Sequence, residues 1–350
     1  FMSLFHNDLG IDLGTANTLL YIKGKGIVMN EPSVVAINQK TGHLLAVGRE
    51  AKQMVGRTPG HIVAIRPLIN GVISDFEITQ EMLRYFLKKS QGKIGGLFNK
   101  RNRVVIGVPC ELTEVERKAV EDASRNAGAK EVYLVEEPLA AAIGMRLPIH
   151  EPVGNVVIDI GGGTSDIAVI SLGGIVHSVS LKVAGDRFNE DITRFVKDKC
   201  KLLIGEPTAE EIKMTIGSAY DTPEVEEQEM TIQGKDMTSG LPRVSAVGTR
   251  EVRMALQKSL ELLVSATKST IEKSPPELVG DLMERGIYLS GGGSLLRGID
   301  VLMAREIGVP VHITDDPLTT VVRGTGIIIE NLDTLRPILL NEKIPRSAIG

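Results

Sequence analysis

IDIGGGTSD, residues 158–166, and IDLGTANT, residues 11–18, repeat one pattern far apart in the chain. In each, an apolar run typical of a buried strand reaches an aspartate, Asp159 or Asp12, and continues into a turn that contains glycine. A glycine in such a turn lets backbone N–H groups approach a phosphate with no side chain in the way. We therefore predict two similar halves that face each other, each presenting one turn to the same polyphosphate.

The two turns contain the candidate phosphate ligands. They are Gly14, Thr15, Ala16 and Asn17 in the first turn, and Gly161, Gly162, Gly163 and Thr164 in the second. The two aspartates are predicted to hold a hydrated Mg²⁺ between them, because Mg²⁺ is bound by a few carboxylates together with waters and phosphate oxygens. One such turn alone is equally explained as a tight hairpin with a solvated aspartate. Two copies, and a third glycine turn at SGGGSLL (290–296), favour the phosphate site. The chain has no P-loop motif.

Composition excludes several classes of protein. The chain has 350 residues, 42% of them hydrophobic, which is ample for packed cores. The net charge is −4, from 40 basic and 44 acidic residues, so we predict no nucleic-acid partner. Two cysteines are too few for a disulfide framework and suit a reducing cytosol. No apolar run reaches the roughly 20 residues that a membrane-spanning helix needs.

Short apolar strands alternate with helical patterns. Strands are predicted at LGIDLG (9–14), TLLYIKG (18–24), SVVAINQ (33–39), VVIGVP (104–109), VVIDIGGG (156–163), IAVISLGG (167–174) and GIYLSGGG (286–293). A helix is predicted to follow Thr113, which forms a capping box with Glu116, and to end at Gly128. This alternation is typical of an α/β protein with mostly parallel sheets. EVEEQEM (224–230) alternates like a half-exposed strand, and QGKDMTSGLP (233–242) is typical of a hairpin tip.

Four motifs resemble, in order, the phosphate, connecting, second phosphate and adenosine motifs of the actin-like ATPase superfamily. They are IDLGTANT, VEEPLAAAIG (135–144), IDIGGGTSD and YLSGGGSLLRGID (288–300). Within that superfamily, further segments look like the MreB family of bacterial rod-shape cytoskeletal proteins. These segments are EPSVVAI (31–37), VGRTP (55–59), RPLINGVISDFE (66–77), TAEEIKMTIGSA (208–219) and KSPPELVGDLMERGI (273–287). The resemblance covers essentially the whole chain, and the order and spacing of the motifs make it specific.

The resemblance implies an actin-like ATPase fold, with two duplicated halves around a nucleotide cleft and a smaller subdomain inserted in each. We expect a first core from 1–32 and 67–150 with the C-terminal residues 325–350, and a second core from 151–182 and 250–324. The inserted subdomains are predicted at 33–66 and at 183–249, the latter also because it is more charged than its surroundings.

The resemblance also implies roles for individual residues. Glu137, next to Pro138, matches the position that polarises the attacking water, so Glu136 is less favoured as the base, and Thr164 would help to orient that water. Glu210, Glu211, Ile212 and Lys213 would flank the adenosine, and Ser290, Gly291, Gly292 and Gly293 would pass under the adenine and ribose. Because Glu210 and Lys213 lie three residues apart, they are also explained as a surface pair on a helix.

The implied function is an ATP- and Mg²⁺-dependent filament that lies in the cytoplasm on the inner face of the plasma membrane and organises cell-wall synthesis. The implied partners are further copies of the chain, in paired antiparallel protofilaments, and membrane proteins of the elongation machinery. A small-molecule kinase is an alternative on the same fold, although such an enzyme needs an acceptor site. A chaperone is another, but it normally has a peptide-binding domain after the ATPase, which we do not expect here.

IGGLFNKR (94–101) is predicted to bind an anionic membrane surface. Leu97 and Phe98 would enter the lipid interface, while Lys100, Arg101 and Arg103 would meet acidic head groups. A second apolar contact is predicted near the start of the chain, at Met2, Leu4 and Phe5. The alternative is that Leu97 and Phe98 fold back onto the core.

Overall fold

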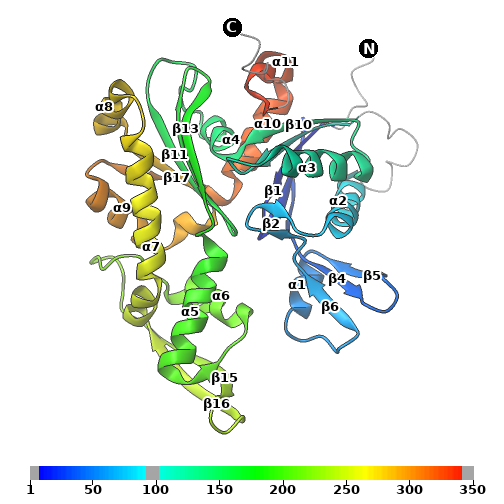
Figure 1. Ribbon diagram of the computed structural model, residues 1–350, viewed down its shortest axis with the longest axis vertical. Coiled ribbons are helices and arrows are strands. Elements are labelled where there is room, and N and C mark those ends of the chain that lie inside the picture. The colour runs from blue at the N-terminus through cyan, green and yellow to red at the C-terminus, as the bar shows by residue number, and fades with distance from the viewer. Residues whose placement is uncertain (1–7, 92–101, 341–350) are drawn as a thin grey trace.

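Two five-stranded sheets form the cores of two halves in the computed structural model, which describes residues 8–91 and 102–340 (Figure 1). The predicted membrane residues Met2, Leu4, Phe5, Leu97 and Phe98 lie outside the described residues. Within the described part of the chain, no helix combines the length and the apolar character that crossing a membrane requires.

The first large sheet has the strand order β10-β9-β1-β2-β3. Its strands are β1 (Leu9–Leu13), β2 (Asn17–Ile22), β3 (Gly26–Pro32), β9 (Arg103–Val108) and β10 (Glu131–Glu136). β1 pairs antiparallel with β2 and parallel with β9. Our sequence prediction missed β3, whose exposed Ile27 and Val28 interrupt the alternation of a half-buried strand.

The second large sheet repeats this arrangement in the order β13-β12-β11-β17-β18. Its strands are β11 (Asn155–Ile160), β12 (Ser165–Ser171), β13 (Gly174–Leu181), β17 (Ile287–Ser290) and β18 (Val311–Ile313). β11 pairs antiparallel with β12 and parallel with β17. The prediction of mostly parallel sheets was wrong, because the short glycine turns after β1 and β11 can join only antiparallel neighbours.

Helices cover the sheets and connect the two halves. They are α1 (Arg49–Met54), α2 (Phe76–Gln91), α3 (Glu114–Ala127), α4 (Glu137–Gly144), α5 (Gly185–Cys200), α6 (Glu206–Ile216), α7 (Thr249–Glu272), α8 (Pro276–Arg285), α9 (Ile299–Ile307), α10 (Thr320–Glu330) and α11 (Leu332–Leu335). The predicted capping box of α3 is confirmed, since Thr113 and Glu116 exchange hydrogen bonds. Gly128 follows the helix with a φ of 122°, which also confirms the predicted end of this helix.

Each half also has one three-stranded sheet, which lies at the end of that half away from its large sheet (Figure 1). One contains β4 (Val35–Asn38), β5 (Leu44–Val47) and β6 (Ile62–Ile65), and the other contains β14 (Leu202–Leu203), β15 (Glu229–Asp236) and β16 (Pro242–Gly248). A short hairpin, β7 (Leu68–Ile69) and β8 (Val72–Ile73), follows β6. The division of the chain into four subdomains stays a prediction.

The hairpin tip predicted at 233–242 is confirmed, because β15 and β16 pair antiparallel and the turn that joins them, 237–241, lies within this segment. The strand predicted at 224–230 was wrong over most of its length, since β15 begins only at Glu229. The backbone N–H of Val225 instead bonds to Thr222 within a turn, and that of Gln228 bonds to the side chain of Thr249. These bonds use backbone groups that a longer strand would need.

The helices α4 and α10 cross where the two halves join, and glycines bring their backbones into contact. A Cβ added to Gly324 would lie 1.8 Å from the carbonyl oxygen of Ala140, and one added to Gly144 would lie 2.1 Å from that of Thr320. A side chain at either position would therefore separate the helices, and the cavity described below lies beside this junction.

We expect Gly324→Ala to lower the free energy of unfolding by about 1–3 kcal/mol, because the added methyl group overpacks a backbone contact. Gly280→Ala is the matched control, since Gly280 lies in α8 and its Cβ would meet no atom within 4 Å. That change should stabilise the protein by up to about 1 kcal/mol through helix propensity. Chemical denaturation of the three proteins measures both effects, and equal stability of Gly324→Ala and wild type would contradict the close crossing.

Candidate active site

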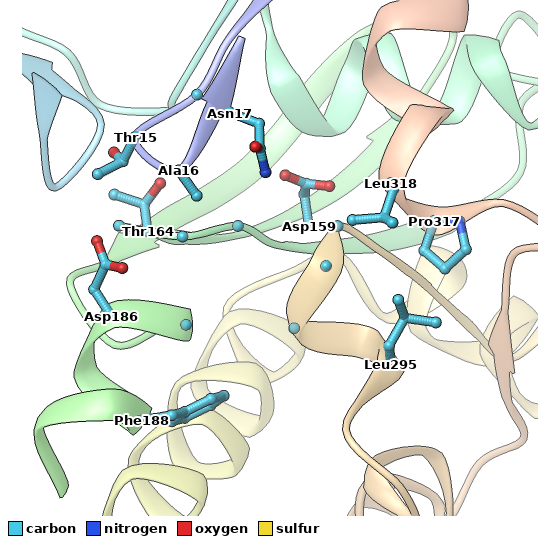
Figure 2. A pocket seen from close by; sticks show the side chains of 18 of the residues that line it. Thr15, Ala16, Asn17, Asp159, Thr164, Asp186, Phe188, Leu295, Pro317 and Leu318 are labelled. Atoms are coloured by element: carbon cyan, nitrogen blue, oxygen red, sulfur yellow. The ribbon is translucent and has the colours of Figure 1, made fainter. Parts of the chain in front are cut away.

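A cavity of about 480 Å³ lies between the two halves and collects most of the predicted site residues. The first half contributes Asp12, Gly14, Thr15, Ala16, Asn17 and Glu137, and the second contributes Asp159, Gly161, Gly162, Gly163, Thr164, Glu210, Lys213, Gly291, Gly292 and Gly293. Figure 2 shows Thr15, Ala16 and Thr164 at one end of this cavity and Leu295, Pro317 and Leu318 at the other. The cavity therefore has one end lined by polar side chains and another end lined by apolar side chains.

The two glycine turns have the same local structure. The backbone N–H of Gly14 donates to the carbonyl oxygen of Asn17 at 3.1 Å, and that of Gly161 donates to the carbonyl oxygen of Thr164 at 2.9 Å. These bonds close the turns that follow β1 and β11, at equivalent positions of the two halves. The duplication read from the sequence is therefore a duplication of backbone geometry.

The turns also touch each other across the cavity. A Cβ on Gly162 would lie 2.6 Å from the Cβ of Ala16, and one on Gly163 would lie 2.5 Å from Oγ1 of Thr15. A larger residue at Gly162 or Gly163 would push the halves apart, so these two glycines are required by contact between the halves as well as by the turn itself.

Asp12 and Asp159 are carboxylates near the ends of equivalent strands; Asp159 is buried and Asp12 is half-buried. Burial and the neighbouring charge of Asp159 raise the pKa of Asp12 to about 8. Burial raises the pKa of Asp159 to about 6, although the hydroxyl of Ser290 donates to it at 2.5 Å and opposes the shift. A cation between the two groups would remove the cost of ionising both, so this pair fits Mg²⁺.

No group of three or more His, Cys, Asp or Glu side chains could hold a metal ion within residues 8–91 and 102–340. The donor set is still suitable for Mg²⁺, which usually keeps several waters and takes only one or two carboxylates together with phosphate oxygens. The protein would thus supply two carboxylates, and solvent and a bound polyphosphate would supply the other oxygens.

Glu137 begins α4 directly after β10 and is only 7% exposed. Burial raises the pKa of its carboxyl well above the usual range, and the charges of Asp166, Asp12 and Asp159 add to the shift. Glu137 lines the cavity, whereas Glu136 does not. The structure therefore places the carboxylate that we predicted as the catalytic base, rather than its neighbour, in the lining of the cavity.

Asp166 is a further carboxylate beside the site, fully buried, which our sequence analysis missed. It accepts the backbone N–H of Cys110 at 2.7 Å, and burial raises its pKa to about 7. The signal was present in IDIGGGTSD, because the predicted hairpin pairs Asp166 directly with Asp159. Asp166 does not line the cavity, so it acts on the site through its charge and through the segment that it holds at Cys110.

The other end of the cavity has exposed apolar side chains that sequence reasoning also missed. Met214, Leu295 and Leu318 line it with exposed fractions of 76%, 54% and 45%. Apolar side chains that face a cavity suit the flat ring of a base. Leu295 lies in SGGGSLL and Met214 in TAEEIKMTIGSA, two segments that had been singled out, whereas Leu318 lies in neither.

The residues predicted around the adenosine divide into two groups. Glu210 and Lys213 line the cavity but do not pair with each other: Glu210 binds Lys52 at 2.8 Å, and Lys213 donates to the carbonyl oxygen of Gly185 at 2.9 Å. Ile212 is fully buried in the hydrophobic cluster of the second half, and Glu211 is exposed, so neither lines the cavity. Ser290 does not line the cavity either; its hydroxyl donates a hydrogen bond to Asp159, which does.

The duplicated halves, the paired glycine turns and the cavity between them define an actin-like fold. A family model described as MreB/Mbl protein matches residues 6–337, and the chain therefore belongs to the MreB/Mbl family. The relatives extend over nearly its whole length. It is 52% identical to the cell shape-determining protein Mbl of Bacillus subtilis (strain 168), over 95% of this chain and 98% of that one. It is 50% identical to the cell shape-determining protein MreB of Escherichia coli (strain K12), over 95% of this chain and 96% of that one.

Solved structures agree with this assignment. The crystal structure of MreB5 of Spiroplasma citri bound to AMPPNP has a TM-score of 0.87 and 39% identity, and covers 93% of this chain and 96% of that one. A MamK double helical filament has a TM-score of 0.78 at 22% identity, over 93% of this chain and 99% of that one, and supports the fold alone.

Proposed function

We propose that this protein binds ATP with Mg²⁺ in the cavity between its halves, assembles into filaments and hydrolyses ATP slowly as part of determining cell shape. The observation that carries the proposal is the meeting of two duplicated glycine turns over one cavity, with Asp12, Asp159 and Glu137 in its lining and close enough for their charges to interact. It is supported by the AMPPNP in the related MreB5 structure and by the names of the relatives as cell shape-determining proteins.

In this proposal the backbone N–H groups of the two turns hold the phosphates, and the apolar end receives the base. Asp12 and Asp159 hold Mg²⁺, which when bound neutralises phosphate charge. Glu137 accepts the proton of the attacking water, and Thr164 orients that water. Glu137 must be ionised for this step, and neutralising the charges of Asp12 and Asp159 lowers its raised pKa toward that state.

Sedimentation and electron microscopy of the purified protein with ATP, with and without lipid vesicles, test the proposal. We expect ATP-dependent pelleting, phosphate release and filaments that lie on the vesicles. Phosphorylation of a sugar without assembly would instead identify a kinase. Contacts between copies in paired antiparallel protofilaments, and with membrane proteins of the elongation machinery, belong to the same proposal.

Attachment to the inner face of the plasma membrane is proposed from the sequence of residues 94–101. We expect Leu97→Ser/Phe98→Ser to reduce co-sedimentation with anionic vesicles strongly. Two apolar side chains contribute roughly 3–6 kcal/mol before association costs, and each nearby basic residue contributes about 1 kcal/mol. A filament multiplies these weak contacts through avidity.

Assembly in solution, measured in parallel, is the control for this variant and should be unchanged. Undiminished vesicle binding by the mutant filaments would place the membrane site elsewhere, with Met2, Leu4 and Phe5 as the next residues to change. Loss of folding would favour packing of Leu97 and Phe98 against the core.

A further inference from the structure

Arg66 connects the two halves through two carboxylates. It follows β6 in the first half, and its Nη1 lies 3.0 Å from Oδ1 of Asp186 at the start of α5 in the second half. Its Nη2 pairs with Glu206 in the first turn of α6. The motif RPLINGVI, which begins with this arginine, has no other role in the proposed site beyond the turn at Gly71.

A second ion pair lies beside the first. Nζ of Lys52, in α1 of the first half, is 2.8 Å from Oε2 of Glu210 in α6. Lys52, Asp186 and Glu210 all line the cavity, so both ion pairs lie at its edge. Figure 1 shows the elements that carry them on facing sides of the molecule, with α1 and β6 opposite α5 and α6.

The charges at this edge are balanced and partly screened from solvent. Three cations, Lys52, Arg66 and Lys213, face three carboxylates, Asp186, Glu206 and Glu210. The side chain of Arg66 is 23% exposed, and those of Asp186 and Glu206 are 30% and 42% exposed. Burial alone would lower the pKa of Arg66, but the nearby carboxylates raise it overall.

Neither helix needs Arg66 for its own structure. Asp186 and Glu206 lie in the first turns of α5 and α6. Carboxylates in this position are already stabilised by the unpaired backbone N–H groups and the dipole of a helix. The main effect of Arg66 is therefore to join the first half to the second through these two ion pairs.

We infer that Arg66, through Asp186 and Glu206, is a positioning residue that holds the halves closed over the nucleotide and thereby sets the rate at which the nucleotide leaves. The inference rests on the proposed nucleotide site. A ligand in the cavity passes this edge to reach solvent, which requires the ion pairs to separate. Partly exposed ion pairs are individually weak and are screened by salt, so they open reversibly.

Stopped-flow dissociation of a fluorescent ADP analogue in the presence of Mg²⁺ tests the inference. We expect Arg66→Gln to raise the dissociation rate constant about three- to tenfold, the range for losing two weak ion pairs. The single-turnover rate of hydrolysis of bound ATP should stay unchanged, since Arg66 does not line the cavity. Raising the ionic strength should speed dissociation from the wild type and have a smaller effect on the variant.

A double-mutant cycle that combines Arg66→Gln with Glu206→Gln distinguishes loss of the ion pair between these residues from a general loss of stability. Each single variant should speed release, and the double variant should be no faster than Arg66→Gln alone. Arg57→Gln is the matched control, because Arg57 is exposed in the same part of the first half and has no ion pair among the described residues.

Multiplicative effects of the two single variants, or dissociation rates equal to that of the wild type, would overturn the inference. If Arg66→Gln fails to fold, Glu206→Gln alone decides, through its dissociation rate and its salt dependence. A wild-type protein that binds no nucleotide would overturn the proposed function instead, so the two failures are distinguishable.

Discussion

Glu137→Ala should lower ATP turnover by about 10²–10⁴-fold, the usual contribution of a group that removes or positions a proton. Nucleotide affinity should change little, because the phosphate turns, Asp12 and Asp159 remain in place. Filaments that form with ATP should therefore persist longer, since their nucleotide is hydrolysed more slowly. Phosphate release and light scattering, followed in the same sample, measure the two effects together.

Glu136→Ala is the matched control for this experiment. Glu136 precedes Glu137 in the chain but does not line the cavity, so its loss should leave turnover within a few-fold of the wild type. Hydrolysis by Glu137→Ala at the wild-type rate during assembly would remove Glu137 from the mechanism. An equal loss in both variants would indicate damage to β10 and α4 instead.

Asp12→Asn should stabilise the protein when neither Mg²⁺ nor nucleotide is present, and should remove the stabilisation that they provide. The pKa of Asp12 rises from its usual 3.8 to about 8. A carboxyl with a raised pKa contributes stability that is fully present below about pH 3.8 and is lost as the pH rises through about 8. At pH 8 the asparagine therefore avoids the free-energy cost of ionising Asp12 in the folded protein. This cost is on the order of a few kcal/mol, since each pKa unit corresponds to about 1.4 kcal/mol.

Thermal unfolding between pH 5 and 8.5, with a chelator, with Mg²⁺ and with Mg²⁺ and ATP, measures this effect at conditions flanking the pKa of about 8. The wild type should lose stability as the pH rises with chelator present, and the variant should lose less. Asp198→Asn is the control, because Asp198 is an exposed carboxylate on α5. A pH profile and a Mg²⁺ dependence of Asp12→Asn equal to those of the wild type would exclude Asp12 from the cation site.

Asp159→Asn should gain less stability than Asp12→Asn, because the pKa of Asp159 is raised only to about 6.

The sequence was most informative where the chemistry is local. The two strand–aspartate–glycine segments predicted the duplicated hairpins, because a turn and its closing hydrogen bond involve a few consecutive residues. Glu137 was predicted as the base because it precedes a proline in a family motif, and it lines the cavity. The residues brought together by these segments line one cavity.

The sequence was least informative where the partners are distant. Asp186 and Glu206 lie more than a hundred residues from Arg66, and no periodicity relates them. The apolar end of the cavity combines Met214 on α6 with Leu318 on a separate turn, and each is an ordinary apolar residue in its own segment. The error at 224–230 has a similar origin, since alternation predicts a strand but cannot show which backbone groups bond elsewhere.

Gly162 contacts Ala16, and Gly163 contacts Thr15. These two contacts are the fulcrum, the fixed point about which one half would rotate against the other. In a rigid rotation, displacement grows with distance from the fulcrum. The small sheets that contain β4–β6 and β14–β16 lie at the ends of the two halves away from the large sheets (Figure 1). A small rotation at the glycine turns is therefore amplified at the small sheets, and in the proposed filament it would change the outer surfaces that a neighbouring copy could contact.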